Sequence, residues 1–137
     1  MKKIMIVDDS LFMRMLLKNV IHELGYEQVV EASNGVEALS LYPEEMPDVV
    51  TMDITMPEMD GITALEKIKD LNPDAKVIMV SAMGQQALLI RAVSMGASDF
   101  IVKPFSKDRV REALKKRSPD NARESLRKQR LVWYNGL

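Results

Sequence analysis

Cysteine is absent from the 137 residues of this chain. The protein therefore has no disulfide framework, no thiolate metal site and no sulfur nucleophile. Long apolar runs are absent too, since none approaches the roughly 20 residues that span a bilayer. Asp8 and Asp9 also interrupt the region where a signal peptide has its apolar core. We therefore expect a cytoplasmic protein without membrane insertion.

An excess of charge of one sign is also missing. The chain has 19 Lys and Arg against 20 Asp and Glu, a formal net charge of −1. Proteins that bind nucleic acid through phosphate contacts have a strong positive bias, so no DNA binding is expected. The remaining composition, 47% hydrophobic and 28% charged, is typical of one ordinary globular domain.

Short apolar runs alternate with amphipathic stretches along the chain. The run 48–53 has no polar alternation, which is typical of a strand buried on both faces. Further strands are expected at 4–7, 28–31, 76–80 and 99–102, and helices at 11–24, 34–41, 62–71, 85–95 and 107–116. This order predicts an α/β fold, a doubly wound five-stranded parallel sheet with five helices on both faces, of the flavodoxin-like type.

Local signals set the expected ends of the helices. Ser10 or Asp9 is suited to cap the first helix, and Gly25 to stop it. Pro43 and Pro47 mark the loop that follows the short second helix. After the last helix, turn-forming residues begin a basic tail that breaks the pattern. We expect a C-terminal extension over 118–137, either helical or disordered.

Reactive polar residues stand at the ends of four apolar runs: Asp8 and Asp9, Asp53, Ser81 and Lys103. In a parallel sheet these ends meet at the carboxyl edge, where open α/β sheets bind ligands. Three carboxylates together repel one another and raise one another's pKa unless a cation joins them. Magnesium prefers such hard oxygen ligands. A lone aspartate here could simply cap a helix, but the full set favours a magnesium site.

The same set of residues suits phosphoryl capture. An aspartate at the end of a buried strand can attack phosphorus and form an aspartyl phosphate. The transferred group carries spread negative charge, so a divalent cation and a fixed positive side chain stabilise the reaction. Asp53 is the candidate nucleophile, Lys103 supplies the fixed charge, and the Ser81 hydroxyl could donate to a phosphoryl oxygen.

Four sequence motifs resemble those of response-regulator receiver domains: VDDS, MDITMPEMDG, SAMG and FIVKPF. They occur in receiver-like order and spacing over residues 1–117, which we expect to form the receiver domain. The resemblance implies that Asp53 is the phosphoacceptor. It also implies that Asp9, Asp53 and the backbone carbonyl of Thr55 bind Mg²⁺ directly, and that Asp8 holds a metal-bound water.

The resemblance also implies a conformational switch. Phosphate on Asp53 would draw in the Ser81 hydroxyl, and the aromatic ring of Phe100 would move inward. Tyrosine is frequent at this position in the family, and a phenylalanine keeps the packing part of the switch without the phenolic hydrogen bond. The peptide bond between Lys103 and Pro104 is expected to be cis, as is usual in receivers.

Within the family, the chain resembles single-domain chemotaxis messengers. We expect a histidine kinase (CheA-like) as phosphodonor, a flagellar motor switch protein as output partner and a phosphatase that resets the switch. Such a protein is not an enzyme beyond self-phosphorylation from small donors and slow autodephosphorylation. The expected partner surface consists of Gln86, Leu89, Phe100, Val102 and Ser106.

Other functions are open within and outside the family. The chain could be a stand-alone phosphorelay receiver or a receiver from a larger regulator; its end soon after the last helix favours the messenger. A nucleotide- or flavin-binding module would need a glycine- or hydroxyl-rich phosphate loop where this chain has DDSLF. A haloacid-type hydrolase would need a second acid at position 55, where this chain has threonine.

Overall fold

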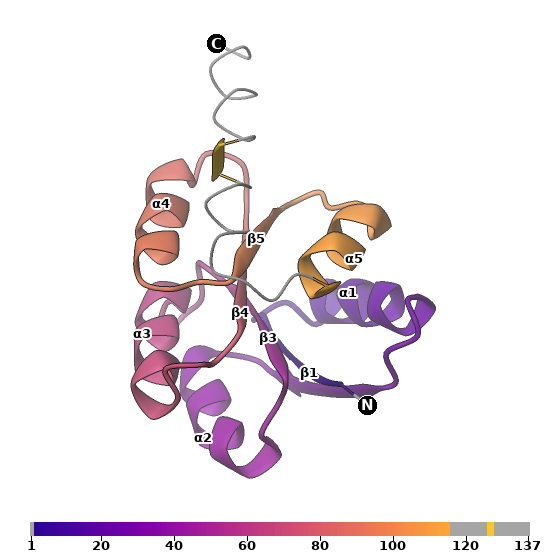
Figure 1. Ribbon diagram of the computed structural model, residues 1–137, viewed down its shortest axis with the longest axis horizontal. Coiled ribbons are helices and arrows are strands. Elements are labelled where there is room, and N and C mark those ends of the chain that lie inside the picture. The colour runs from indigo at the N-terminus through magenta and orange to yellow at the C-terminus, as the bar shows by residue number, and fades with distance from the viewer. Residues whose placement is uncertain (1, 116–125, 128–137) are drawn as a thin grey trace.

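Five parallel strands alternate along the chain with five helices in the part that the structure describes (Figure 1). The structure is a computed structural model that describes residues 2–115 and 126–127. The strands form one sheet in the order β2-β1-β3-β4-β5. The elements in chain order are β1 (Lys3–Val7), α1 (Leu11–Glu23), β2 (Gln28–Ala32), α2 (Gly35–Glu45), β3 (Val49–Asp53), α3 (Gly61–Leu71), β4 (Val77–Ser81), α4 (Gln86–Ser94), β5 (Asp99–Val102) and α5 (Lys107–Lys115).

The helices form a layer on each face of the sheet. Leu17 and Ile21 of α1 pack with Val110 and Leu114 of α5 in one buried cluster. Residues of α2, α3 and α4 contribute to a second, larger cluster on the opposite face. The doubly wound α/β fold expected from the sequence is therefore confirmed.

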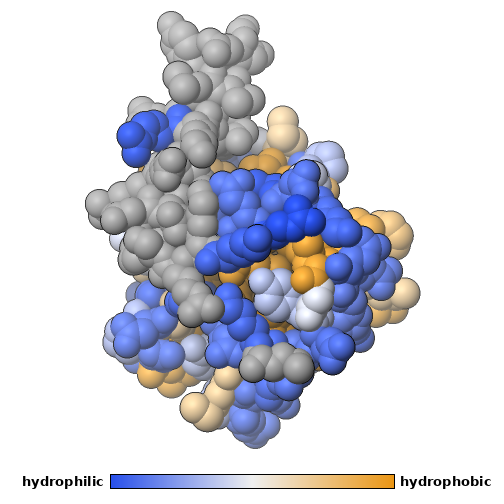
Figure 2. All heavy atoms as spheres, turned by 45° about the vertical axis from the view of Figure 1, so that its right-hand side comes forward, coloured by the Kyte–Doolittle hydropathy of each residue, from blue (hydrophilic) through white to orange (hydrophobic). Residues whose placement is uncertain are grey.

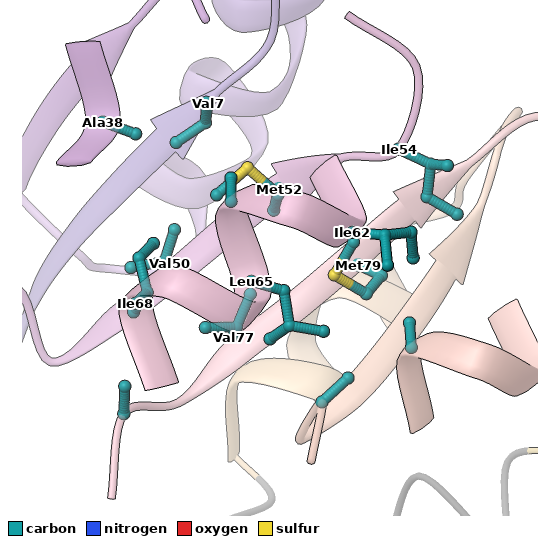
Figure 3. Packing of buried hydrophobic residues seen from close by; sticks show 14 of the residues in the cluster. Val7, Ala38, Val50, Met52, Ile54, Ile62, Leu65, Ile68, Val77 and Met79 are labelled. Carbon is teal, nitrogen blue, oxygen red and sulfur yellow. The ribbon is translucent and has the colours of Figure 1, made fainter. Parts of the chain in front are cut away.

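Alternation along each strand supplies both clusters. In β1, Ile4 and Ile6 belong to the cluster beneath α1 and α5, whereas Met5 and Val7 belong to the cluster beneath the other three helices. Figure 3 shows the larger cluster, with strand residues such as Val50, Met52 and Val77 close to α3 residues Leu65 and Ile68. Strands covered on both faces need apolar residues on both sides, which explains why the central parts of these strands are mostly apolar.

Polar side chains cap three helices on the carboxyl side of the sheet. Ser10 Oγ accepts a hydrogen bond from Met13 N–H, and Asn34 and Asp60 cap α2 and α3 in the same way. These bonds satisfy amide donors that lack partners within the first helical turn. At the other end of α1, Gly25 has a φ of 97°, in the left-handed region that favours glycine. The predicted start and stop signals of this helix are confirmed.

The prediction for the end of the second helix was wrong. Helix α2 continues through Pro43 to Glu45, and Met46 closes it in a left-handed conformation. Proline removes one helical hydrogen bond, to the carbonyl four residues earlier, so a proline close to the helix end costs less than one in its centre. Tyr42 is buried in the core and its carbonyl accepts a bond from Met46 N–H, which favours the extra turn.

Most of the predicted C-terminal extension, 118–137, lies outside the described residues. Within it the structure describes Leu126 and Arg127, both helical, and Leu126 packs against the larger core cluster. In the described part of the chain, no helix has the length and apolar character needed to cross a membrane. Figure 2 shows hydrophilic residues around much of one face of the protein, with hydrophobic residues exposed in smaller areas.

Candidate functional site

Three carboxylates meet at the carboxyl edge of the sheet. Asp8 and Asp9 follow β1, and Asp53 is the last residue of the adjacent strand β3. One carboxylate oxygen from each residue lies within 4.8 Å of the others. Asp8 and Asp53 are buried whereas Asp9 is exposed. The acids that the sequence analysis selected are therefore brought together in an arrangement that could hold a cation.

Lys103 reaches the same cluster from the end of β5. Its Nζ lies 3.3 Å from Asp8 Oδ2 and 3.5 Å from Asp53 Oδ1. In the pairing of β4 with β5, Ser81 lies opposite Val102, so Lys103 is the next residue along the chain beyond this pair. One ammonium group therefore lies near two buried carboxylates at the carboxyl ends of different strands.

The charge of the cluster is not balanced by Lys103 alone. Burial raises the pKa of Asp53 from 3.8 to about 6, with Asp8 as the next cause and Asp9 adding a smaller effect. The Lys103 ammonium opposes this rise by its charge and by its hydrogen bond. A second nearby cation would stabilise the charged form of a carboxyl group whose pKa is raised in this way. The residues present therefore fit a divalent metal ion, which prefers oxygen ligands.

The loop after Asp53 approaches its own strand closely at Gly61. Gly61 N–H donates to the carbonyl of Ile54 at 2.7 Å. A Cβ on Gly61 would clash with the backbone carbonyl oxygen of Asp53. The MDG motif led us to expect a glycine that lets the loop turn sharply here; the structure shows that close backbone approach, and not an unusual φ, requires it. Gly61 therefore packs directly against the end of the strand that carries the candidate acceptor.

Ser81 lies at the end of β4 with its side chain completely buried. Its hydroxyl has no hydrogen-bond partner in the described part of the protein. Buried polar groups are normally paired, so such a group is a candidate for binding an atom that is added later. The Ser81 carbonyl, in contrast, accepts a 2.7 Å bond from Lys103 N–H. Ser81 is therefore anchored by its backbone while its hydroxyl has no partner.

Sequence reasoning missed Gln85. Its Nε2 donates to Thr55 Oγ1 at 2.7 Å, and its Oε1 accepts from the backbone N–H of Ala82 at 2.7 Å. This side chain thus joins the loop after β3 to the loop after β4. The sequence held no signal for it, because the two partners lie in loops whose relative position depends on the folded sheet.

The expected partner surface is only partly exposed. Ser106 is exposed, and Gln86 and Val102 are half-buried. Leu89 is only 1% exposed and belongs to the core, so its assignment to the surface was wrong in this conformation. Helical periodicity turns Leu89 inward and its neighbours Leu88 and Ile90 outward, at 37% and 49% exposure.

Phe100 also lies inside the protein. It is 2% exposed, and the guanidinium carbon of Arg109 lies 6.0 Å from the centre of its ring. The ring therefore occupies an inward position in this structure and is not part of the exposed surface. The peptide bond between Lys103 and Pro104 is cis, as the motif around it led us to expect.

Comparison with known proteins gives one family for this architecture. The family model of the response regulator receiver domain matches residues 4–115. Among curated proteins, the chemotaxis protein CheY of Thermotoga maritima is 58% identical over 92 residues, which cover 67% of this chain and 77% of that protein. CheY of Bacillus subtilis is 58% identical over 91 residues, covering 66% and 76%.

Solved structures give the same result. A chain of the CheX-CheY-BeF3-Mg complex from Borrelia burgdorferi is similar with a TM-score of 0.78 and 38% identity, covering 82% of this chain and 86% of that one. The response regulator domain of Thermotoga maritima CheB has a TM-score of 0.74 and 38% identity, covering 84% and 95%.

Proposed function

This chain belongs to the response regulator receiver domain family, and on that premise we propose that Asp53 accepts a phosphoryl group and thereby switches binding to an output protein in chemotaxis. Receiver domains are phosphoacceptor switches of two-component systems rather than conventional enzymes. The observation that carries the assignment of Asp53 is its place between Lys103 and the two acids that follow β1.

In the proposed reaction, an Asp53 carboxylate oxygen attacks the phosphorus of the donor. The new oxygen–phosphorus bond forms as the bond to the donor breaks, and the leaving group keeps the electron pair. With a phosphohistidine donor, the departing imidazole nitrogen then takes up a proton. Lys103 holds a positive charge beside the acceptor, where it stabilises the charge of the transferred group.

We further propose that Asp9, Asp53 and the Thr55 backbone carbonyl are the direct ligands of Mg²⁺, and that Asp8 acts through a metal-bound water. Bound Mg²⁺ would supply positive charge to phosphoryl oxygens during transfer. The clustered oxygens and the raised pKa of Asp53 support this site. The similar Borrelia burgdorferi CheY belongs to a complex that contains Mg and BeF3.

Ser81 and Phe100 are the proposed switch residues. The unpartnered Ser81 hydroxyl would donate to a phosphoryl oxygen on Asp53, which would move the end of β4 and the loop after it. Phe100 in the neighbouring strand β5 would stabilise the switched state through its packing in the interior. Its ring is already buried in the present structure, so in this role it would repack within the core and would not move in from solvent.

The proposed phosphodonor is a histidine kinase of the CheA-like type. Four apolar side chains in the first half of α1, the helix that follows Asp9, are exposed and support docking of a protein donor: Leu11, Phe12, Met15 and Leu16. Phe12 is 71% exposed in the first turn of the helix. Exposed apolar patches of this kind mark sites of protein interaction.

The proposed output partner is a flagellar motor switch protein, and a phosphatase is the proposed means of reset. The proposed output surface keeps the exposed Ser106 and the half-buried Gln86 and Val102, with the exposed Leu88 and Ile90 in place of the buried Leu89. We also propose 118–137 as a separate extension of the receiver. Leu126, one of the two described residues in this range, packs against the larger core cluster.

The decisive experiment compares the wild type with Asp53→Asn in the presence of Mg²⁺ and acetyl phosphate. The intact mass of the wild type should rise by one phosphoryl group, and that of the variant should stay unchanged. Equal labelling of both proteins would remove Asp53 as the acceptor. Asp48→Asn is a suitable control, because Asp48 lies at the start of β3, at the opposite edge of the sheet.

A further inference from the structure

The side chain of Gln85 fastens one particular peptide unit of the candidate switch. This unit consists of the Ser81 carbonyl and the Ala82 N–H, at the point where β4 ends. The carbonyl accepts a 2.7 Å bond from Lys103 N–H, and the N–H donates a 2.7 Å bond to Gln85 Oε1. The peptide unit is therefore held from both sides, once by backbone and once by a side chain.

The other end of the Gln85 amide is also occupied. Its Nε2 donates to Thr55 Oγ1, two residues beyond Asp53, at 2.7 Å. The oxygen of this amide group thus binds the loop after β4, and its nitrogen binds the loop after β3. These are the two loops that border the acceptor, so a displacement of either loop must stretch one of the two bonds.

Movement of Ser81 conflicts with this bridge. Its hydroxyl is buried without a partner, so a phosphoryl oxygen on Asp53 would draw the residue toward the acceptor. The Ala82 N–H belongs to the peptide unit that joins Ser81 to Ala82, and a displacement of Ser81 changes its direction. Ala82 and Met83 are exposed, so contacts in the core do not hold this part of the loop.

We propose that Gln85 is a latch that stabilises the unphosphorylated conformation by joining Thr55 to the Ala82 N–H. The inference rests on the proposed function of Asp53. While the latch is closed, the Ala82 N–H is occupied and cannot donate to a phosphoryl group. Opening it frees this donor next to the Ser81 hydroxyl. Gln85 is a positioning residue, since it acts through the two loops and holds no part of the metal or acceptor site.

Because the latch must open first, it lowers the affinity of the site for a phosphoryl mimic relative to the same site without the latch. A neutral hydrogen bond of this kind shifts an equilibrium by about two- to tenfold. Gln85→Leu removes both bonds at similar side-chain size. We expect it to bind beryllofluoride in the presence of Mg²⁺ about two- to tenfold more tightly than the wild type. Thr55→Val removes one bond and keeps the Thr55 backbone carbonyl.

The test is a double-mutant cycle on the full chain with Gln85→Leu, Thr55→Val and the double variant. Beryllofluoride affinity is titrated by NMR at fixed Mg²⁺, and Asn19→Leu serves as a control that removes an exposed amide on α1. If the two residues form one latch, the effect of the double variant should be smaller than the product of the two single effects. Hydrogen exchange of the Ala82 amide should be slow in the wild type and faster in Gln85→Leu.

Three results would contradict the latch, and they differ in meaning. A wild type that binds beryllofluoride, with a Gln85→Leu variant of the same affinity and the same Ala82 exchange, overturns the latch and leaves the acceptor assignment intact. A wild type that fails to bind beryllofluoride at all removes the proposed function, and the latch with it. Fully multiplicative effects of the two substitutions would also overturn the latch, because they would show that Thr55 and Gln85 act separately.

Discussion

Lys103 Nζ lies 3.5 Å from Asp53 Oδ1, although Asp53 ends β3 and Lys103 follows β5, with β4 between these two strands. Lys103 therefore favours the charged form of the proposed acceptor carboxylate from beyond the neighbouring strand β4, and it offsets part of the rise in the pKa of Asp53 that burial causes. We expect Lys103→Met to raise the pKa of Asp53 above about 6, because the ammonium lowers it. Carbon-13 NMR titration of the aspartate carboxyls would measure this change.

The same variant should lose phosphorylation. Removing a fixed positive charge beside a transferred phosphoryl group costs on the order of tenfold or more in rate. The rate of labelling by acetyl phosphate measures the effect. Lys107→Met is the matched control, since Lys107 forms an exposed ion pair with Glu23. Equal rates for Lys103→Met and the wild type would contradict the role of the ammonium.

Magnesium affinity should depend on pH through Asp53. Its pKa is about 6, so protonation competes with the metal below that pH. We expect the affinity to fall by up to about tenfold per pH unit below pH 6 and to level off above pH 7. Calorimetric titration at several pH values would measure it. An affinity that is constant from pH 5 to 7 would show that Asp53 does not bind the metal.

Without metal, the free energy of unfolding should depend on pH in the direction opposite to that of the magnesium affinity. Because the pKa of Asp53 is raised on folding from 3.8 to about 6, the folded state binds more protons than the unfolded state between these values. This group therefore stabilises the protein as the pH falls from 7 to 4. Asp53→Asn should raise the free energy of unfolding at pH 7 by about 1–2 kcal/mol, allowing for solvent screening. Urea unfolding at pH 4 and pH 7 would test the difference.

Gly61→Ala should destabilise the protein and also damage the site. The new Cβ clashes with the Asp53 carbonyl, and overpacking of this kind costs about 1–3 kcal/mol. Gly25→Ala is a useful control, since its cost of about 1–2 kcal/mol comes from the left-handed φ alone. Only Gly61→Ala should also weaken Mg²⁺ binding. Equal Mg²⁺ affinity in both variants would mean that the contact does not position Asp53.

Adjacent leucines of α4 should differ in their effects. Leu89→Ala removes a buried side chain and should cost about 2–5 kcal/mol of the free energy of unfolding. Leu88→Ala changes an exposed side chain and should cost no more than about 0.5 kcal/mol. If the proposed output surface is correct, only the second variant weakens binding of a motor-switch peptide while the domain stays fully folded. Circular dichroism and peptide titration separate the two effects.

The exposed apolar side chains of α1 should matter for a protein donor only. We expect Phe12→Ser to slow phosphoryl transfer from a histidine kinase and to leave labelling by acetyl phosphate unchanged. Leu71→Ser provides a control, because Leu71 is an exposed leucine at the end of α3 and outside the carboxyl edge. Slower labelling by acetyl phosphate would indicate damage to the site rather than to docking.

The sequence predicted the sheet well because each strand must be apolar on both faces. Asp53 and Ser81 were found for the same reason, since each ends a run that is otherwise hydrophobic. The side of α4 that faces the core was harder to predict, because Ala87 to Ile90 are all apolar and do not indicate which of them is buried. Leu89 was assigned to the wrong side for this reason.

Two other features required the folded structure. The extension of α2 past Pro43 depends on the burial of Tyr42, which a proline rule does not include. The bridge made by Gln85 depends on two loops that are distant in sequence but adjacent at one edge of the sheet. Both depend on tertiary contacts that no local pattern records.

The strand order also separates the proposed metal ligands after β1 from the proposed switch residues at β4 and β5. β3 is the central strand, with the acids after β1 on one flank and Ser81 and Lys103 on the other. Substitutions near the end of β1 should therefore alter the affinity for metal. Substitutions near the ends of β4 and β5 should alter the response of the protein to phosphorylation. Natural variation could tune the lifetime of a signal and the identity of its recipient almost independently, with one aspartate common to both.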